Sequence, residues 1–414
     1  MKKGLLISLG GTPAPLINSI NYHRPDVLLF FTSKETQKYV SDVISSSAGN
    51  FGLQDAIVTP SSENFTICFE TLYKELPKKM ELYEVSYENL IVDFTGGTKN
   101  MSAAMALATA EFTREFSYVG GKERTKEGVG VVINGEEYLY NANNPWDALA
   151  IPSRKRISLL FNKARFTSAA EEIKMVKDRV SPQLKMLFDA LYDTVEGFYN
   201  WDNFRYKKAN DLINKGIRKL KDYAGASGDK ELENWTHNIE RKLLPVIKKL
   251  YEEQQKQKFS DTFIKDLLAN ASRRGKEHKH DDAVIRHYSC IEHFAKVCLD
   301  EKHGINNSSV PPDQIPENIR EEFTRKYKEE DENLKLPLKA SYRLLSALKD
   351  PLGEKFMKMY DTEIHKYTGY RNNSPVIHGL NPVTEKQFQQ MFNFICDLYE
   401  INPDDLIQFP ELKL

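Results

Sequence analysis

The chain has 414 residues, which is enough for two or three domains that each bury a core of their own. Its 58 basic and 59 acidic side chains leave a formal net charge of −1, which excludes a general basic field, so any contact with nucleic acid must be local. The four cysteines form no CxxC pair and match no zinc spacing, and no apolar run approaches the roughly 20 residues of a membrane span. These features predict a soluble protein of the reduced cytoplasm.

Residues 1–155 alternate short apolar runs with helical segments, which is typical of an α/β domain with a parallel sheet covered on both faces. Asn134-Gly135 is a strong hairpin signal and predicts that an antiparallel ribbon closes the sheet. The expected strands are residues 4–9, 26–31, 90–94, 116–119, 129–133 and 137–140.

Two glycine-rich loops, residues 8–13 and 95–99, follow strands of this domain. In a parallel sheet, loops at the carboxyl ends of the strands converge on one crevice. Glycines let backbone amides approach a phosphate, and a helix that begins near Asn100 would turn its positive end to the same place. Neither loop has the Walker A or GxGxxG spacing. The first loop alone is better read as a simple turn, whereas the hydroxyls and Lys99 of the second favour a phosphate or ribose contact.

The remainder of the chain is predicted to be helical. Residues 156–258 lose glycine and strand character and gain charge at helical spacing, and residues 259–414 are helical again. A proline-bearing loop at residues 310–312 and a break at residues 371–378 interrupt this second helical part. Thr384 and Gln387 predict a capping box that opens a final helix, which should end near Tyr399.

The break at residues 371–378 carries an arginine and a histidine with six residues between them. RNA supplies its own nucleophile, the ribose 2′-hydroxyl, so cleavage needs a group that moves a proton near neutral pH and a positive group for the phosphate. His378 can supply the first and Arg371 the second. Pro375 disfavours helix at Ser374, so the bent backbone can bring both side chains to one cleft. The alternative is an exposed arginine and a helix-end histidine, a pair that is common by chance.

The quoted segments resemble a known family. Three segments resemble the CARF domain of CRISPR-associated proteins. They are the run Leu-Gly-Gly-Thr-Pro-Ala-Pro-Leu at residues 9–16, residues 93–101 and residues 143–146. Residues 282–288, together with residues 371–379, resemble a HEPN domain. The order CARF, helical region, HEPN spans nearly the whole chain and resembles the type III CRISPR accessory ribonucleases that cyclic oligoadenylates activate.

The resemblance implies a Rossmann-like CARF sensor at residues 1–155, a helical spacer at 156–258 and an α-helical HEPN ribonuclease at 259–414. It also implies a homodimer, a single-stranded RNA substrate, no metal or cofactor, and an allosteric activator, with cyclic tetra-adenylate favoured over cyclic hexa-adenylate. The catalytic motif falls on Arg371 and His378, with Asn372 as a support residue. The ligand loops fall on Ser8, Gly10, Gly11, Thr12, Thr95, Gly96, Gly97, Thr98 and Lys99.

Two other classes of function compete with a ribonuclease. A ligand-dependent transcription regulator would need a DNA-binding module, which would leave the break at residues 371–378 unexplained. A restriction-type nuclease would need a strand-borne Asp and Glu-x-Lys with a bound metal, whereas the carboxyl half is predicted to be helical. Independence of divalent metal separates the ribonuclease from the restriction-type nuclease.

Several further side chains allow two interpretations each. His287 and His293 miss the metalloprotease spacings and are better read as core or surface residues. The basic run at residues 273–280 is better read as a solvated linker than as an RNA contact. Tyr288 and Arg286 lie on a helix expected to face the catalytic segment. Trp146 suits stacking on an adenine and sealing the sheet edge equally well.

Overall fold

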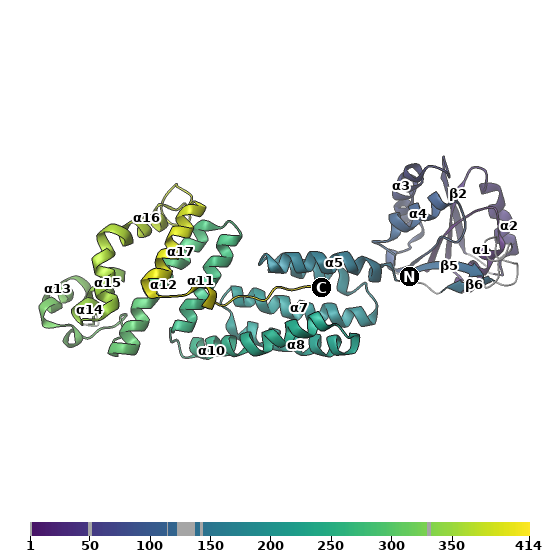
Figure 1. The fold of residues 1–414 in the computed structure, drawn as a ribbon. Coiled ribbons are helices and arrows are strands. Elements are labelled where there is room, and N and C mark those ends of the chain that lie inside the picture. Colours follow the sequence, from purple (N-terminus) through teal and green to yellow (C-terminus); the bar gives the residue numbers. More distant parts are fainter. Residues whose placement is uncertain (1, 49–51, 114, 122–136, 141–143, 329–332) are drawn as a thin grey trace. The chain divides into compact units, whose positions relative to one another are not determined.

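The computed structural model describes residues 2–48, 52–113, 115–121, 137–140, 144–328 and 333–414 (Figure 1). Their contacts divide the chain into two compact units, residues 1–154 with 174–188, and residues 155–173 with 189–414. The domain boundaries near residues 155 and 258 stay a prediction. No helix among the described residues is both long and apolar enough to cross a membrane.

The strands are β1 Gly4–Ser8, β2 Val27–Ser33, β3 Leu53–Thr59, β4 Leu90–Asp93, β5 Glu115–Gly121 and β6 Glu137–Tyr140. The helices are α1 Ala14–His23, α2 Val40–Ser46, α3 Phe65–Tyr83, α4 Lys99–Thr109, α5 Pro145–Asn162, α6 Phe166–Lys177, α7 Pro182–Asp202, α8 Tyr206–Ser227, α9 Lys230–Asn238, α10 Leu244–Gln255, α11 Asp261–Lys276, α12 His280–His303, α13 Glu317–Tyr327, α14 Leu338–Ala347, α15 Pro351–Met359, α16 His365–Asn373 and α17 Glu385–Tyr399.

The described strands of the first unit form one sheet in the order β3-β2-β1-β4-β5-β6. Neighbouring strands from β3 to β5 are parallel, and β6 pairs antiparallel with β5. The predicted parallel sheet is therefore confirmed, and its antiparallel end is formed by β5 and β6. The expected strand at residues 129–133 and the Asn134-Gly135 turn lie outside the described residues.

Helices cover both faces of this sheet (Figure 1). Alternate residues of β1 and β2 point to opposite sides, as the pleat requires. One set, which includes Leu5 and Phe30, packs under α1 and α2, and the other set, which includes Leu6 and Phe31, packs under α3 and α4. The unit is thus a three-layer α/β fold of the doubly wound kind, as predicted.

The edge strand β3 was missed in the sequence. Its residues include Gln54 and Asp55, which interrupt the apolar pattern that marks a buried strand. Asp55 is tied to α3, where Tyr83 donates its hydroxyl to the carboxylate at 2.7 Å and Lys79 forms an ion pair with it. Contacts with α3 therefore stabilise a strand that the local composition does not predict.

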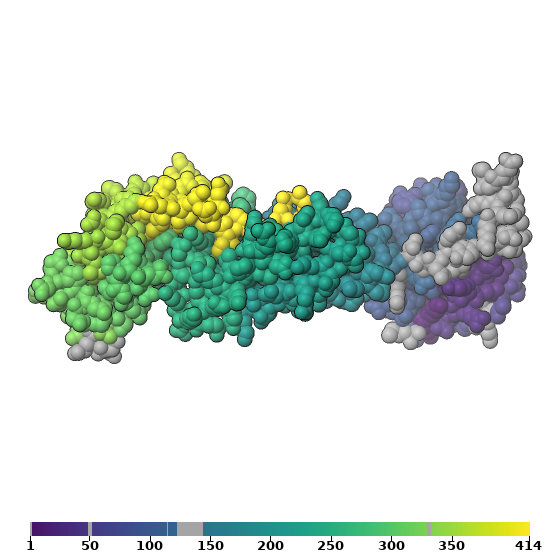
Figure 2. All heavy atoms as spheres, turned by 60° about the horizontal axis from the view of Figure 1, so that its bottom comes forward, coloured from purple at the N-terminus to yellow at the C-terminus, as the bar shows by residue number. Residues whose placement is uncertain are grey.

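The second unit is helical, as predicted, and its main core lies among α11, α12, α14, α15 and α17. The Thr384 capping box opens α17 as expected. After α17 the chain returns along the earlier helices, where Asn162 exchanges two hydrogen bonds of 2.8 and 2.9 Å with the backbone of Leu412. Figure 2 shows yellow atoms from this end of the chain among the teal helices.

The structure corrects one prediction and confirms another in this unit. Arg273 and Arg274 lie at the end of α11 and form ion pairs with buried Asp202 of α7, so the solvated-linker interpretation is wrong for both. His287 is fully buried and stacks on Phe388 with ring centres 5.2 Å apart. Burial lowers the pKa of His287 to about 3, so it is a neutral core histidine, as predicted.

Candidate functional sites

The two glycine loops of the first unit pack backbone against backbone. They follow β1 and β4, which pair in parallel with Ile7 opposite Asp93. A Cβ atom on Gly10 would lie 2.7 Å from the backbone nitrogen of Gly97, and one on Gly96 would lie 2.2 Å from the carbonyl oxygen of Ser8. The glycines are therefore required for the contact between the loops, in addition to any approach to a ligand.

Three of the predicted ligand-binding hydroxyls form hydrogen bonds inside the protein. Ser8 is buried and donates to the carbonyl of Gly96 at 2.6 Å. Thr95 accepts from the backbone amide of Val119 at 2.7 Å. Thr98 donates to the carbonyl of Ser62 at 2.5 Å and caps α4 by accepting from an amide of its first turn. These hydroxyls hold the loops in place.

The groups of the two loops that face outward are fewer. Gly11, Thr12, Gly97 and Lys99 are exposed, and Lys99 is the first residue of α4. Gly97 has φ of +76°, a left-handed conformation that favours glycine. The positive end of α4, the amides of the loops and one lysine ammonium thus lie at one edge of the sheet, where they suit an anionic ligand.

Buried polar groups lie beneath the loops at this edge of the sheet. Asp93, at the end of β4, is fully buried and accepts hydrogen bonds from the hydroxyl of Ser19 at 2.5 Å and from the amide of Thr95 at 2.9 Å. His23 is buried nearby, with Nε2 at 2.9 Å from the hydroxyl of Ser117. Asp93 therefore fixes the start of the second loop.

We expect Gly96→Ala to destabilise the first unit by about 1–3 kcal/mol, because the new methyl would collide with the backbone. Gly11→Ala is the matched control, since a Cβ there meets no atom within 4 Å. Urea unfolding of the two variants measures the difference. Equal free energies of unfolding would show that the loops do not pack as described.

We also expect the first unit to lose stability in acid through His23. Burial, followed by the charge of Lys3, lowers the pKa of His23 to about 4, against the opposing effect of Asp93. The unfolded chain titrates this group near 6.5. The native state therefore excludes a proton that the unfolded state binds, so the stability present above about pH 6.5 falls as the pH drops towards about 4. His23→Gln should flatten the melting temperature across this window, and an unchanged profile would contradict the assignment.

The segment with Arg371 and His378 is bent, as predicted. Helix α16 ends at Asn373, and Ser374 is extended with φ of −67° and ψ of 139°. The chain then turns, and the amides of Ile377 and Gly379 both donate to the carbonyl of Ser374 at 3.0 Å. A Cβ atom on Gly379 would lie 2.0 Å from the carbonyl oxygen of Asn373, so the chain doubles back tightly on the end of α16.

Asp281, which sequence reasoning missed, anchors this bend. It lies in the first turn of α12, where one carboxylate oxygen accepts from the hydroxyl of Ser374 at 2.5 Å and from the amide of Val383 at 3.1 Å. The two contacts hold both sides of the bend to one helix. The only sequence signal was its position directly before the segment at residues 282–288.

Arg371 is partly buried against α12. Its guanidinium carbon lies 4.8 Å from the centre of the Tyr288 ring, and Nη1 donates to the side chain of Asn372 at 2.9 Å. Within the described part of the chain, its buried Nε has no hydrogen-bond partner. Burial raises the pKa of nearby Glu292, against the opposing charges of Lys296 and Arg371. A donor that is held in place but not saturated suits an oxyanion ligand.

The other predicted residues of this site are placed as follows. His378 is exposed on the turn after the break, and Asn372 is exposed at the end of α16. The prediction that Tyr288 faces this segment is confirmed by its contact with Arg371. Arg286 instead forms a 2.5 Å hydrogen bond to Asn270 of α11 and an ion pair with Asp282. The bend thus carries a partly buried arginine and an exposed histidine.

We expect Asp281→Ala to lower the turnover of any reaction at this bend by about 10-fold or more, with little change in substrate affinity, because the residue positions the bend without touching substrate. Ser374→Ala removes one of the same hydrogen bonds. The double variant should therefore lose much less than the product of the two single losses. Independent, multiplying losses would contradict a shared anchor.

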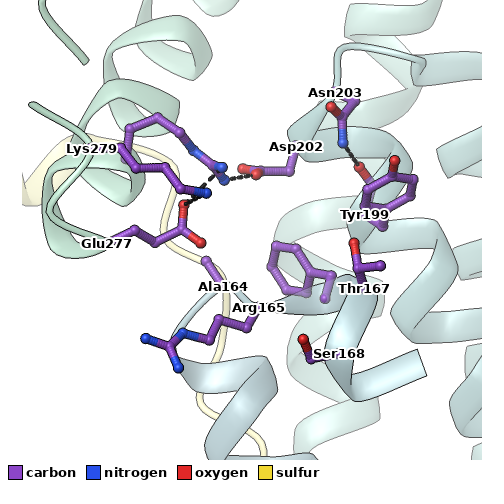
Figure 3. A pocket seen from close by; sticks show the side chains of 11 residues that line it. Ala164, Arg165, Thr167, Ser168, Tyr199, Asp202, Asn203, Glu277 and Lys279 are labelled. Atoms are coloured by element: carbon purple, nitrogen blue, oxygen red, sulfur yellow. Dashed lines mark hydrogen bonds and ion pairs between the residues drawn. The ribbon is translucent and has the colours of Figure 1, made fainter. Parts of the chain in front are cut away.

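A cavity of about 540 Å³ in the helical unit is lined by the start of α6 and the ends of α7 and α11 (Figure 3). Its charges are largely paired, since Glu277 binds Lys279 at 3.3 Å and Arg274 at 2.8 Å. In the first unit, the guanidinium carbon of Arg179 lies 4.6 Å from the centre of the Trp146 ring, which favours the sealing role of this tryptophan over adenine stacking.

Comparison with known proteins places these features in context. Residues 149–244 match the family model described as the Csm6 6H domain, and residues 252–402 match the model described as the Csm6 HEPN domain. Among solved structures, Enterococcus italicus Csm6 bound to cyclic hexa-2'-fluoro-hexa-dAMP is similar at a TM-score of 0.61 and 13% sequence identity, over 98% of this chain and 95% of that one. No curated protein sequence matches significantly. The structural likeness shows a shared fold, and the family models match the bend and the helix that anchors it.

Proposed function

Because this chain belongs to the CARF–HEPN proteins of type III CRISPR systems, we propose that it is an RNA endonuclease that a cyclic oligoadenylate activates. The observation that carries the proposal is the bend after α16. Arg371 is held there against Tyr288 with an unsaturated Nε, and the exposed His378 follows on the turn. Both residues lie within the part of the chain that the HEPN model matches.

The proposed reaction uses groups that RNA and this chain supply. The ribose 2′-oxygen forms a bond to phosphorus while the bond to the 5′-oxygen breaks. His378 moves a proton at the attacking or the leaving oxygen, and Arg371 stabilises the charge on the non-bridging oxygens. The products are a 2′,3′-cyclic phosphate and a free 5′-hydroxyl. No step requires a metal, so we propose metal-independent cleavage of single-stranded RNA.

The proposed activator site is the outward edge of the glycine loops. Gly11, Thr12, Gly97 and Lys99 offer exposed amides, a hydroxyl and a positive charge beside the N-terminus of α4. The complex of the E. italicus protein with a cyclic hexa-adenylate analogue supports a ligand of this class. For this chain we expect cyclic tetra-adenylate to activate more strongly than cyclic hexa-adenylate.

A homodimer completes the proposal. A ring with an even number of identical nucleotides matches a two-fold axis, so two copies of the loops can bind one ring. Two copies of Arg371 and His378 would likewise supply a fuller active site than one. Light scattering at micromolar concentration should give the mass of two chains with and without activator, and a monomer in both conditions would count against the proposal.

The chemistry is tested by the ends of the products. An RNA and a copy with one 2′-deoxy sugar at the cut site are incubated with protein and activator. We expect cleavage of the first to give a 2′,3′-cyclic phosphate or its hydrolysis product, and the second to resist at that position. Efficient cutting of the deoxy position or of DNA would overturn attack by the 2′-hydroxyl.

A further inference from the structure

A cluster of metal-ligating side chains lies in the helical unit, away from the bend at Arg371. Cys298 and His303 come from the last turns of α12, and Asp350 precedes α15. One atom of each, Sγ, an imidazole nitrogen and a carboxylate oxygen, lies within 4.8 Å of the other two. Among the described residues, no other group of three or more His, Cys, Asp or Glu side chains meets this geometry.

Cys298 and His303 both contact the same oxygen of Asp350, Oδ2. Cys298 Sγ lies 3.5 Å from it and His303 Nε2 lies 3.3 Å from it. Tetrahedral zinc with ordinary bond lengths separates sulfur, nitrogen and oxygen ligands by about 3.3–3.6 Å. The other carboxylate oxygen, Oδ1, accepts from the amide of Leu352 at 2.9 Å, which fixes the orientation of Asp350. The Cys298–Asp350 and His303–Asp350 separations already suit a tetrahedral ion.

A lysine supplies positive charge to the same oxygen. Lys302 Nζ lies 3.5 Å from Asp350 Oδ2, and its side chain is 60% exposed, whereas the Asp350 side chain is 4% exposed. Three donors, a thiol, an imidazole and an ammonium, thus surround one carboxylate oxygen.

We propose that Cys298, His303 and Asp350 form a binding site for zinc or a chemically similar transition-metal ion, which joins the end of α12 to the start of α15. A thiolate, a neutral imidazole and a carboxylate are a ligand set that zinc accepts, with water in the fourth position. Thiolate and carboxylate balance the two charges of the ion. The thiol proton is released, and Lys302 turns out to solvent. The site is structural and separate from the proposed RNA chemistry.

Spacing alone did not reveal this site, because Asp350 follows His303 by 47 residues. The cysteine pattern, which has no CxxC pair and no zinc spacing, excludes only metal sites whose ligands are close in the sequence. Helices α12 and α15 bring the three residues together through packing of the core that they share. The proposal therefore departs from the expectation of a chain without metal.

The test uses the full chain after treatment with a chelator, and Co²⁺ as a spectroscopic substitute for zinc. We expect one ion per chain, with a thiolate-to-cobalt charge-transfer band that added zinc removes. Cys298→Ser should abolish the band, and His303→Gln should weaken binding by about 10-fold or more. Lys302→Gln should tighten binding, because a competing cation is removed. Zinc should raise the melting temperature of the parent protein more than that of His303→Gln.

Controls separate this site from general thiol binding and from misfolding. Cys396→Ser removes another buried thiol of the same unit and should keep the band. His303 lies at the end of α12 with a partly exposed side chain, so its replacement tests the site even if Cys298→Ser fails to fold. The absence of a charge-transfer band in the parent protein, an undiminished band in Cys298→Ser, or unchanged affinity in His303→Gln would each overturn the proposal.

Discussion

Replacing His378 or Arg371 by alanine is expected to reduce RNA cleavage by at least about 100-fold, because each change removes a group that acts in the transition state. Folding should survive in His378→Ala, since the side chain is exposed. Arg371→Lys should recover only part of the rate, because lysine keeps the charge but lacks the planar fork that binds phosphate. Initial rates at saturating activator measure cleavage, and calorimetry measures binding of the activator separately.

The matched control for this prediction is His365→Ala, which removes another exposed histidine at the start of α16. It should cleave RNA like the parent protein. If His378→Ala also kept the parent rate, the histidine would not take part in the chemistry and the ribonuclease mechanism would be wrong.

The second large effect is expected at the sensor. Lys99→Ala should weaken binding of the activator by about 10-fold or more, because a charge-assisted contact to phosphate is lost in each copy. The bend at Arg371 belongs to the other unit and is unchanged by this substitution. Activity should therefore return at high activator concentration, whereas His378→Ala should not recover at any concentration. This pattern follows if the ligand shifts an equilibrium between inactive and active states.

Activation curves for cleavage against activator concentration test this coupling. Lys74→Ala removes an exposed lysine of α3 and serves as the control for net charge. Thr98→Ala is a poorer probe than its position suggested, because the Thr98 hydroxyl caps α4 and binds Ser62. If Lys99→Ala left activation by every cyclic oligoadenylate unchanged, the glycine loops would not be the sensor.

Much of the fold could be predicted because the strongest local signals agree with the tertiary structure. The fully buried strands β1 and β2 are continuous apolar runs, and the capping box at Thr384 marks the start of α17. Strand β3 was missed because the partners of Asp55 lie on α3, beyond any local pattern. The basic run was misread for the same reason, since Asp202 precedes Arg273 by 71 residues.

In the candidate sites, too, local sequence signals could be read, whereas contacts between distant residues could not. Arg371 and His378 could be proposed as site residues because both lie at one helix break, where proline makes the bend visible in the sequence. Asp281 was not found, because it contacts Ser374 across 93 residues. The roles of Ser8 and Thr95 also depended on partners that no spacing reveals. Residue type and local spacing therefore indicate candidate groups for the chemistry, whereas the side chains that hold those groups in place are revealed only by the packing.

The central claim is an activator-dependent, metal-independent ribonuclease, and one cleavage assay tests it most directly. Single-stranded RNA is incubated with the full chain in EDTA, alone and with cyclic tetra-adenylate or cyclic hexa-adenylate added separately, while circular dichroism verifies that the protein stays folded. We predict strong cleavage with one of the rings, cyclic tetra-adenylate by our expectation, and little without either. Failure of both rings to stimulate cleavage by folded protein, or cleavage that only added divalent metal restores, would contradict the account.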